Sequence, residues 1–254
     1  MEKSSQRWTN EQLKLAFYLY CQLPFGKLHS RNPIIMQMAS FLGRTSDALA
    51  MKLVNFASLD PAIKSTGRKG LGNASRSDRE IWDLFHDNWS KLAEECEALM
   101  QGNQIIFSLD ENQEVNNFLG ETRDTIVKTR IGQNFFRKSV LASYENICCM
   151  SGVSIPELLI ASHIIPWAKA KDNRLNPSNG LCLSAIHDKA FDKGFLTVLP
   201  DYSIKVSNKL TSYDCNSNQT KLLIQLNGKL IKLPSKFLPE KDFLVWHNNN
   251  IFIS

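Results

Sequence analysis

The strongest constraint on the fold is one stretch in which an apolar run, a polar loop, a second apolar run and a helical segment follow one another. Residues 158–165 are apolar, rich in β-forming residues and followed by a proline, which predicts a buried strand. Asn-Pro and Asn-Gly pairs mark turns within residues 169–180, and residues 181–184 predict a second short strand. Residues 185–192 have helical character, and Gly194 ends the helix. The sequence therefore predicts two strands joined by a long hairpin loop and followed by a helix.

Three polar side chains of this unit lie on different predicted elements. His163 lies near the end of the first strand, Asn179 in the loop and His187 in the helix. Such a unit can bring both imidazoles to one pocket of the size of a metal ion. A neutral histidine, with an ordinary pKa of about 6.5, can take a proton from water. A divalent cation stabilises the charge that builds on a phosphate and its leaving oxygen, and an asparagine can hold the loop through its backbone. The pattern thus favours phosphodiester hydrolysis.

Residues 130 to about 200 resemble the HNH (ββα-metal) endonucleases, and more narrowly their bacterial restriction-type branch. The matching positions are Arg130, Gly132, Gln133, Phe136, Arg137, Tyr144, residues 149–152, residues 162–167, Arg174, residues 179–181 and residues 187–194. The resemblance implies that His163 is the general base, that Asn179 orients the loop and that His187 is a metal ligand on the helix. These are the expected catalytic residues.

The sequence departs from the family at the residue before the base. Many HNH nucleases carry an Asp or a His there as a metal ligand, whereas this chain has Ser162. A neutral hydroxyl is a poorer ligand for a hard divalent ion than a carboxylate. Asp188 or Asp192 could compensate, or a single-metal site could use His187, water and the substrate phosphate. Both alternatives stay open, and Ser162 remains in the candidate ligand set. The implied cofactor is Mg²⁺, with Mn²⁺ or Ni²⁺ as alternatives.

The six cysteines are not arranged as a zinc site, because the chain has no Cys-x-x-Cys pair. Free cysteines without a disulfide framework are typical of a reduced, intracellular protein. The N-terminus lacks the apolar stretch of a secretory signal, and no later run is long enough to span a bilayer. We therefore expect a cytoplasmic protein with no membrane partner.

The first hundred residues have the pattern of a helical module. A capped helix precedes Pro24, a second covers residues 33–42, and a third, capped by Thr45 or Ser46, covers residues 47–56. The last two, joined by a glycine-containing turn, form a helix-turn-helix-like unit. In the DNA-binding motifs that it resembles, the second helix enters the major groove. A three-helix interaction module without DNA contact would have the same pattern.

The expected nucleic-acid contacts are polar or cationic residues in both halves of the chain. The net charge of +5 and pI near 8.8 suit a polyanionic partner without proving one. Residues 64–73 are basic and glycine-rich, which suits a phosphate backbone or, alternatively, a solvated linker. For Arg174 the alternatives are a bidentate phosphate contact and a surface salt bridge. The predicted contacts are Arg44, Lys52, Asn55, Arg68, Lys69, Gln133, Arg137 and Arg174.

Other segments complete an α+β architecture. We expect one amphipathic helix over residues 77–100 and a nuclease-domain helix over residues 135–144, with Gln133 just before it. Residues 195–198, 202–206 and 222–226 predict strands, the last joined through an Asn227-Gly228 hairpin turn to residues 229–233. The predicted domains are a helical DNA-binding or specificity module (1–100), a linker (101–121) and an HNH nuclease domain with a C-terminal β-rich extension (122–254).

These patterns together predict a metal-dependent endonuclease that cuts double-stranded DNA, in restriction or defence against foreign DNA, including modified DNA. A homodimer would supply two sites for two strands. A second hypothesis is a DNA-binding regulator whose HNH-like domain has lost its chemistry, prompted by Ser162. A third, an RNA-directed or toxin nuclease, is disfavoured by the helical module and the absence of a secretion signal.

Overall fold

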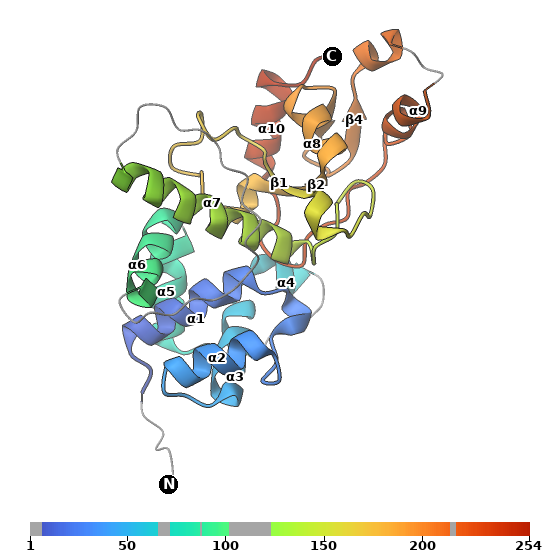
Figure 1. The fold of residues 1–254 in the computed structure, drawn as a ribbon. Coiled ribbons are helices and arrows are strands. Elements are labelled where there is room, and N and C mark those ends of the chain that lie inside the picture. Colours follow the sequence, from blue (N-terminus) through green and yellow to red (C-terminus); the bar gives the residue numbers. More distant parts are fainter. Residues whose placement is uncertain (1–6, 66–71, 87, 102–122, 214–216) are drawn as a thin grey trace. The chain divides into compact units, whose positions relative to one another are not determined.

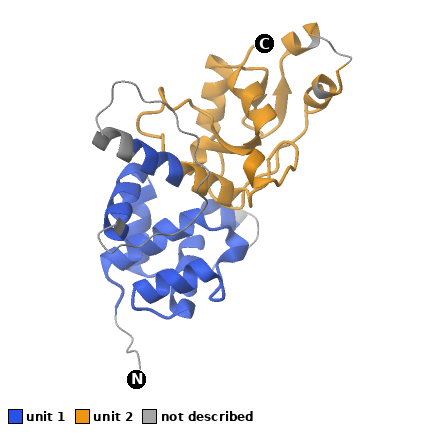
Figure 2. Cartoon of the chain, in the orientation of Figure 1, with its two compact units in different colours: residues 1–135 blue, residues 136–254 orange. Residues whose placement is uncertain are grey.

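The computed structural model describes residues 7–65, 72–86, 88–101, 123–213 and 217–254. The chain divides into two compact units, residues 1–135 and 136–254 (Figure 2). The division falls inside helix α7 (Arg123–Ser143), whereas the sequence predicts a domain that begins at residue 122. The functional limits of the domains stay a prediction. The predicted linker lies almost wholly outside the described residues.

Unit 1 consists of helices in its described part (Figure 1). Thr9 and Gln12 form a capping box at the start of the first helix, and Asn32 and Thr45 cap the next two through their side chains. The three N-terminal helices predicted from these signals are present. The helices are α1 (Asn10–Gln22), α2 (Pro33–Phe41), α3 (Ser46–Ala57), α4 (Pro61–Ser65), α5 (Arg76–His86), α6 (Trp89–Gln101) and the first part of α7.

An aromatic cluster forms the core of unit 1. The ring of Phe17 on α1 lies 5.1 Å from that of Phe56, 5.4 Å from that of Trp82 and 6.0 Å from that of Trp89. These residues come from α3, α5 and α6, so one aromatic side chain joins four helices. Burial of such rings is the main source of stability in a small helical unit.

The prediction of one helix over residues 77–100 is wrong, because α5 ends at His86 and α6 begins at Trp89. Asn88 causes the break. Its backbone N–H donates to the Phe85 carbonyl at 3.0 Å, and its side-chain oxygen accepts from the Lys91 N–H at 3.3 Å. Asparagine favours a helix cap over a helix interior because its side chain can accept such a backbone hydrogen bond. The spacing of the apolar residues alone does not reveal this interruption.

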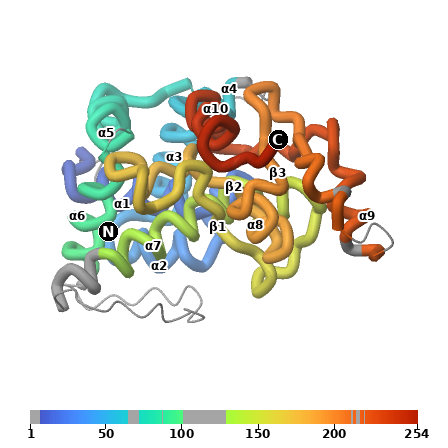
Figure 3. The backbone as a smooth tube through the Cα atoms, turned by 90° about the horizontal axis from the view of Figure 1, so that it is seen from above, coloured from blue at the N-terminus to red at the C-terminus, as the bar shows by residue number. Residues whose placement is uncertain are grey.

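Unit 2 is built on an antiparallel hairpin of β1 (Leu159–His163) and β2 (Gly180–Ser184), in which His163 pairs with Gly180. Helix α8 (Ala185–Asp192) follows β2 directly and lies beside the hairpin (Figure 3). The predicted strand–loop–strand–helix unit is therefore present. A second hairpin pairs β3 (Leu196–Val198) with β4 (Ile204–Val206).

The prediction for the C-terminal part is wrong in two places. Residues 222–226 do not form a strand, because α9 (Asn218–Ile224) occupies most of that run. Backbone hydrogen bonds beside β4 instead join Ile204 to Gly228 and Lys229, both at 2.8 Å, so the segment after the glycine takes the place of the expected strand. Helix α10 (Lys241–Asn250) was not predicted. The extension is thus a short hairpin with helices rather than β-rich.

The C-terminal segment packs on the end of α8. Gly194 has φ +72°, and a Cβ at this position would collide with the Ile251 carbonyl oxygen. The Ile253 N–H donates to the Gly194 carbonyl at 3.0 Å. His247 of α10 stacks on Phe191 of α8, with ring centroids 3.8 Å apart. These contacts hold the C-terminal half of α8.

None of the helices in the described part of the chain combines the length and the apolar character needed to span a bilayer.

Candidate active site

Close packing of a helix on the β1–β2 hairpin sets the position of the candidate base. Gly180 lies opposite His163, and a Cβ on residue 180 would collide with the Val140 side chain and lie 3.0 Å from Phe136. Only glycine therefore lets α7 approach the hairpin this closely at that point. The approach places Phe136 against the last residue of β1.

His163 is held on three sides. Its ring stacks on Phe136 at 3.8 Å between centroids, with 9° between the planes, and meets the Trp167 ring edge-on at 5.6 Å. Its Nε2 lies 2.9 Å from the Arg174 carbonyl oxygen. Because a carbonyl can only accept, Nε2 carries the proton and Nδ1 keeps a lone pair. Within the described residues, Nδ1 makes no hydrogen bond.

Burial lowers the pKa of His163 to about 4, although the hydrogen bond to the Arg174 carbonyl acts in the opposite direction. The imidazole is therefore neutral at pH 7. A neutral ring with one fixed N–H and one free lone pair is the form that a general base requires.

Asn179 is fully buried and joins the segment after His163 to the long loop. Its Oδ1 accepts from the Ile165 N–H at 2.8 Å, and its Nδ2 donates to the Ile165 carbonyl at 3.1 Å and to the Asn173 carbonyl at 3.2 Å. The same loop carries Arg174, whose carbonyl holds His163. Asn179 thus fixes both the strand end and the loop that orients the imidazole.

His187 lies buried in the first half of α8. Its Nδ1 is 2.6 Å from the Ser184 Oγ and 3.9 Å from the Cys148 Sγ. Burial raises the pKa of Cys148, but hydrogen bonds from His187, Ser151 and the backbone outweigh it and lower that pKa to about 6. Sequence reasoning missed Ser184 and Cys148. The three-residue spacing between Ser184 and His187 is the one sequence signal that could have indicated the role of Ser184.

Ser162 and two carboxyl groups occupy the neighbouring region. Successive strand residues project to opposite faces, so Ser162 and His163 point apart. The buried Ser162 Oγ has no well-formed hydrogen bond within the described residues, yet it lies close enough to Asp188 to influence its titration. Burial raises the pKa of Asp188, against the smaller effects of Ser162 and Lys189. Burial and the charge of Asp188 also raise the pKa of Asp192.

The donor types suit a hard divalent cation. Burial disfavours the charge of both carboxylates, and Asp188 also disfavours that of Asp192, so a bound cation would stabilise them. An imidazole nitrogen is a compatible ligand. The donors are not gathered in advance: across the described ranges, no group of three or more His, Cys, Asp and Glu side chains is close enough to hold a metal ion.

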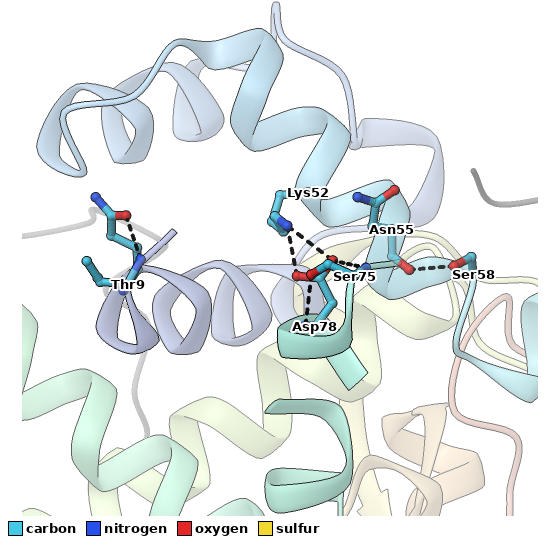
Figure 4. Close-up of polar contacts among 7 residues, drawn as sticks. Thr9, Lys52, Asn55, Ser58, Ser75 and Asp78 are labelled. Atoms are coloured by element: carbon cyan, nitrogen blue, oxygen red, sulfur yellow. Dashed lines mark hydrogen bonds and ion pairs between the residues drawn. The ribbon is translucent and has the colours of Figure 1, made fainter. Parts of the chain in front are cut away.

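Two of the predicted DNA contacts in unit 1 are corrected. The Lys52 Nζ donates to both carboxylate oxygens of Asp78, at 2.8 and 3.1 Å, and Asp78 also accepts from the Ser75 N–H at 2.8 Å (Figure 4). Lys52 and Asp78 are buried, as is Asn55. Lys52 and Asn55 therefore lie on the inner face of α3, away from the surface that a DNA groove would meet. Lys52 is held there by Asp78, whereas the buried Oδ1 of Asn55 has no hydrogen-bond partner among the described residues.

Arg44 is engaged within unit 1. Its Nη2 donates to the Arg7 carbonyl at 2.7 Å and to the Gln12 Oε1 at 2.8 Å, and its guanidinium lies 4.9 Å from the Trp8 ring centroid. The residues that α3 exposes are Asp47 and Met51, so its outer face offers no cation to a phosphate. Arg68 and Lys69 lie outside the described residues.

The other predicted DNA contacts within the described residues lie on α7 and on the long loop between β1 and β2. Gln133 lies within α7 and not before a helix, because α7 starts at Arg123. Arg137 donates to the Leu159 carbonyl at 2.8 Å, which binds α7 to β1. Arg174 donates through Nε to the Trp167 carbonyl at 2.8 Å and covers the Trp167 ring at 5.2 Å. Within the described residues no carboxylate contacts Arg174, so its terminal nitrogens can still meet a phosphate.

Residues 148–199 match the family model for the HNH endonuclease. The match covers both strands of the first hairpin, α8 and β3, and therefore includes His163, Asn179 and His187. The chain thus carries an HNH endonuclease domain, a class of hydrolase that acts on the phosphodiester bonds of nucleic acid and typically uses a divalent metal. The match does not specify a branch of the family, and no curated protein matches the chain.

Proposed function

We propose that the chain is a metal-dependent endonuclease of double-stranded DNA, with His163 as its general base. The observation that carries the proposal is the fixed, neutral imidazole of His163, whose Nε2 is held by the Arg174 carbonyl and whose Nδ1 makes no hydrogen bond in the part of the chain that the structure describes. A water molecule beside Nδ1 would give up its proton to this nitrogen as it attacks a phosphate. Phe136 and Trp167 keep the ring in place, so little orientational freedom is lost in the reaction.

The cation site of the proposal lies at α8. His187, Asp188 and Asp192 would hold the ion, with Ser162 beside Asp188. When bound, the cation would stabilise the charge on the phosphate and the leaving oxygen. Arg174 would bind a neighbouring phosphate through its terminal nitrogens. Its backbone carbonyl already orients His163, so one loop residue would serve both the substrate and the base.

A role in restriction or defence against foreign DNA is the biological part of the proposal. It is supported by the helical unit 1, in which Gly43, with φ +64°, turns the chain between α2 and α3 as in a helix-turn-helix. The outer face of α3 carries Asp47 and Met51, however, which suits protein contact better than groove contact. A homodimer would place one site on each DNA strand.

The test is cleavage of plasmid DNA by the purified protein with Mg²⁺, Mn²⁺ or Ni²⁺. We expect His163→Ala to reduce the rate by about 100-fold or more, because a positioned general base contributes on that order. His29→Ala, at an exposed position of unit 1, is the matched control. Cleavage by His163→Ala at the wild-type rate would contradict the role of His163 as the general base. Matched DNA with plain, methylated, hydroxymethylated or glucosylated cytosine identifies the target.

A DNA-binding regulator with a degenerate HNH domain is the second candidate. The observation in its favour is Ser162, a neutral residue where many relatives carry a metal ligand, next to donors that are not gathered. Site-specific DNA binding without cleavage, in every metal and on every modified substrate, would establish this alternative and overturn the nuclease proposal.

A further inference from the structure

Ser184 is at the N-cap of α8 but does not act as a cap. A serine at this position normally accepts a hydrogen bond from the backbone N–H of the second or third helical residue, and this contact stabilises the helix. In α8 the Ser184 side chain makes no such bond. Its Oγ lies instead 2.6 Å from Nδ1 of His187, which is the third residue of the helix. The hydroxyl therefore contacts the ring of the residue whose backbone it would ordinarily cap.

The direction of this hydrogen bond decides what His187 can do. If Nδ1 carries the proton and Ser184 accepts, Nε2 keeps a lone pair that can bind a cation. If Ser184 donates to Nδ1, Nε2 carries the proton and cannot be a ligand. A hydroxyl that accepts from the ring keeps the acceptor role it has in an ordinary cap, and only the donor changes from backbone to side chain.

The surroundings of the ring fit the first arrangement. The Cys148 Sγ is a second neighbour of Nδ1, at 3.9 Å, so one N–H can be shared between an oxygen and a sulfur. Ser184 and His187 are both buried, which makes an unsatisfied Nδ1–H costly. Nε2 makes no hydrogen bond within the described residues and stays available.

We propose that Ser184 is a positioning residue that holds His187 in the Nδ1–H tautomer and so directs its Nε2 lone pair to a divalent cation. This inference rests on the proposed function, in which His187 is a metal ligand. Hydrogen-bond partners on the second nitrogen of a ligating histidine fix its tautomer and orientation, and their loss typically weakens metal binding by about 10- to 100-fold.

The experiment reads the tautomer directly in metal-free protein. Nitrogen-15 NMR of the histidine-labelled chain distinguishes a protonated from an unprotonated ring nitrogen, and the signals of His187 are assigned by their loss in His187→Gln. We expect wild-type His187 with Nδ1 protonated and Nε2 unprotonated. Ser184→Ala should give a mixture of tautomers and weaken Mn²⁺ binding, measured by calorimetry, by about 10-fold or more.

Two further variants separate positioning from folding. Ser184→Thr keeps the hydroxyl and should restore both the tautomer and the Mn²⁺ affinity. Ser207→Ala removes another buried serine hydroxyl of unit 2, which accepts from the Lys209 N–H at 3.1 Å, and should change neither readout. Circular dichroism establishes that each variant is folded.

The outcomes that overturn the inference differ from those that overturn the nuclease proposal. A wild-type His187 with Nε2 protonated contradicts the role of Ser184. So does a folded Ser184→Ala protein with unchanged tautomer and unchanged Mn²⁺ affinity. Intact Mn²⁺ binding with the expected tautomer shift, but no DNA cleavage in any metal, overturns the nuclease proposal and leaves the positioning role supported.

Discussion

At the scale of single residues, the protonation of His163 sets the acid limit of the proposed activity. The active form is the neutral ring, which predominates above the pKa of about 4. At saturating metal, kcat/KM should therefore stay nearly constant from pH 8 down to about pH 5 and fall only as the pH approaches 4. A pH–rate profile with its acid midpoint near the ordinary histidine value of about 6.5 would contradict this prediction.

The buried ion pair of Lys52 and Asp78 gives a second prediction at this scale. Lys52→Ala leaves a buried carboxylate with the Ser75 N–H but without its cation, which should cost about 3–5 kcal/mol in the free energy of unfolding. Urea denaturation measures this loss. DNA affinity of the folded variant should be unchanged, with the exposed Lys27→Ala as control. Weakened DNA binding at unchanged stability would instead restore the groove-contact role of Lys52.

At the scale of elements, Gly180 controls the distance between α7 and the hairpin. In Gly180→Ala the new Cβ meets Val140 and Phe136, so the helix must move away from the strand. Overpacking of this kind typically costs about 1–3 kcal/mol. Because Phe136 supports the His163 ring, we also expect slower DNA cleavage. Gly26→Ala is the control, since no atom lies near the added Cβ there. Equal stability and activity of the two variants would contradict the prediction.

Elements with strong local signals could be predicted from the sequence. The capping box of Thr9 and Gln12 and the proline at the start of α2 defined helix ends by short-range chemistry, and the apolar runs around His163 defined a hairpin. The run at residues 222–226 has equally good strand character but forms α9 instead. Whether these residues form a strand depends on which segment pairs with β4, and tertiary contacts determine that pairing.

The candidate site was predicted only in part for the same reason. His163, Asn179 and His187 have a spacing that a sequence pattern can show. The partners that set their chemistry cannot be found from spacing, because the Arg174 carbonyl is a backbone atom and Cys148 is distant in sequence. For Lys52, the sequence pattern led to a wrong expectation about burial. A lysine on a predicted outer helix was expected at a surface, but Asp78 from α5 neutralises it in the interior.

At the scale of the whole molecule, buried histidines make unfolding depend on pH. Burial lowers the pKa of His247 to about 4, from about 6.5 in the unfolded chain. The unfolded state therefore binds more protons between pH 4 and 6.5, and the free energy of unfolding rises with pH across this window. At about 1.4 kcal/mol per pKa unit, His247 should contribute up to about 3 kcal/mol that is lost on acidification.

Urea denaturation at several pH values tests this contribution. His247→Gln removes one titrating ring and should reduce the dependence between pH 4 and 6.5, leaving the part that His163 contributes, with His29→Ala as an exposed control that retains all of it. A His247→Gln protein with the same pH dependence as the wild type would show that His247 is not held neutral by the fold.

The packing of Ile251 and Ile253 on Gly194 also limits how the gene for this chain can change. A stop codon before position 251 would uncover the end of the helix that carries His187, Asp188 and Asp192. Loss of residues 251–253 should therefore disturb the helix as a substitution within it would, and should reduce the proposed nuclease activity as far as a change in the motif does.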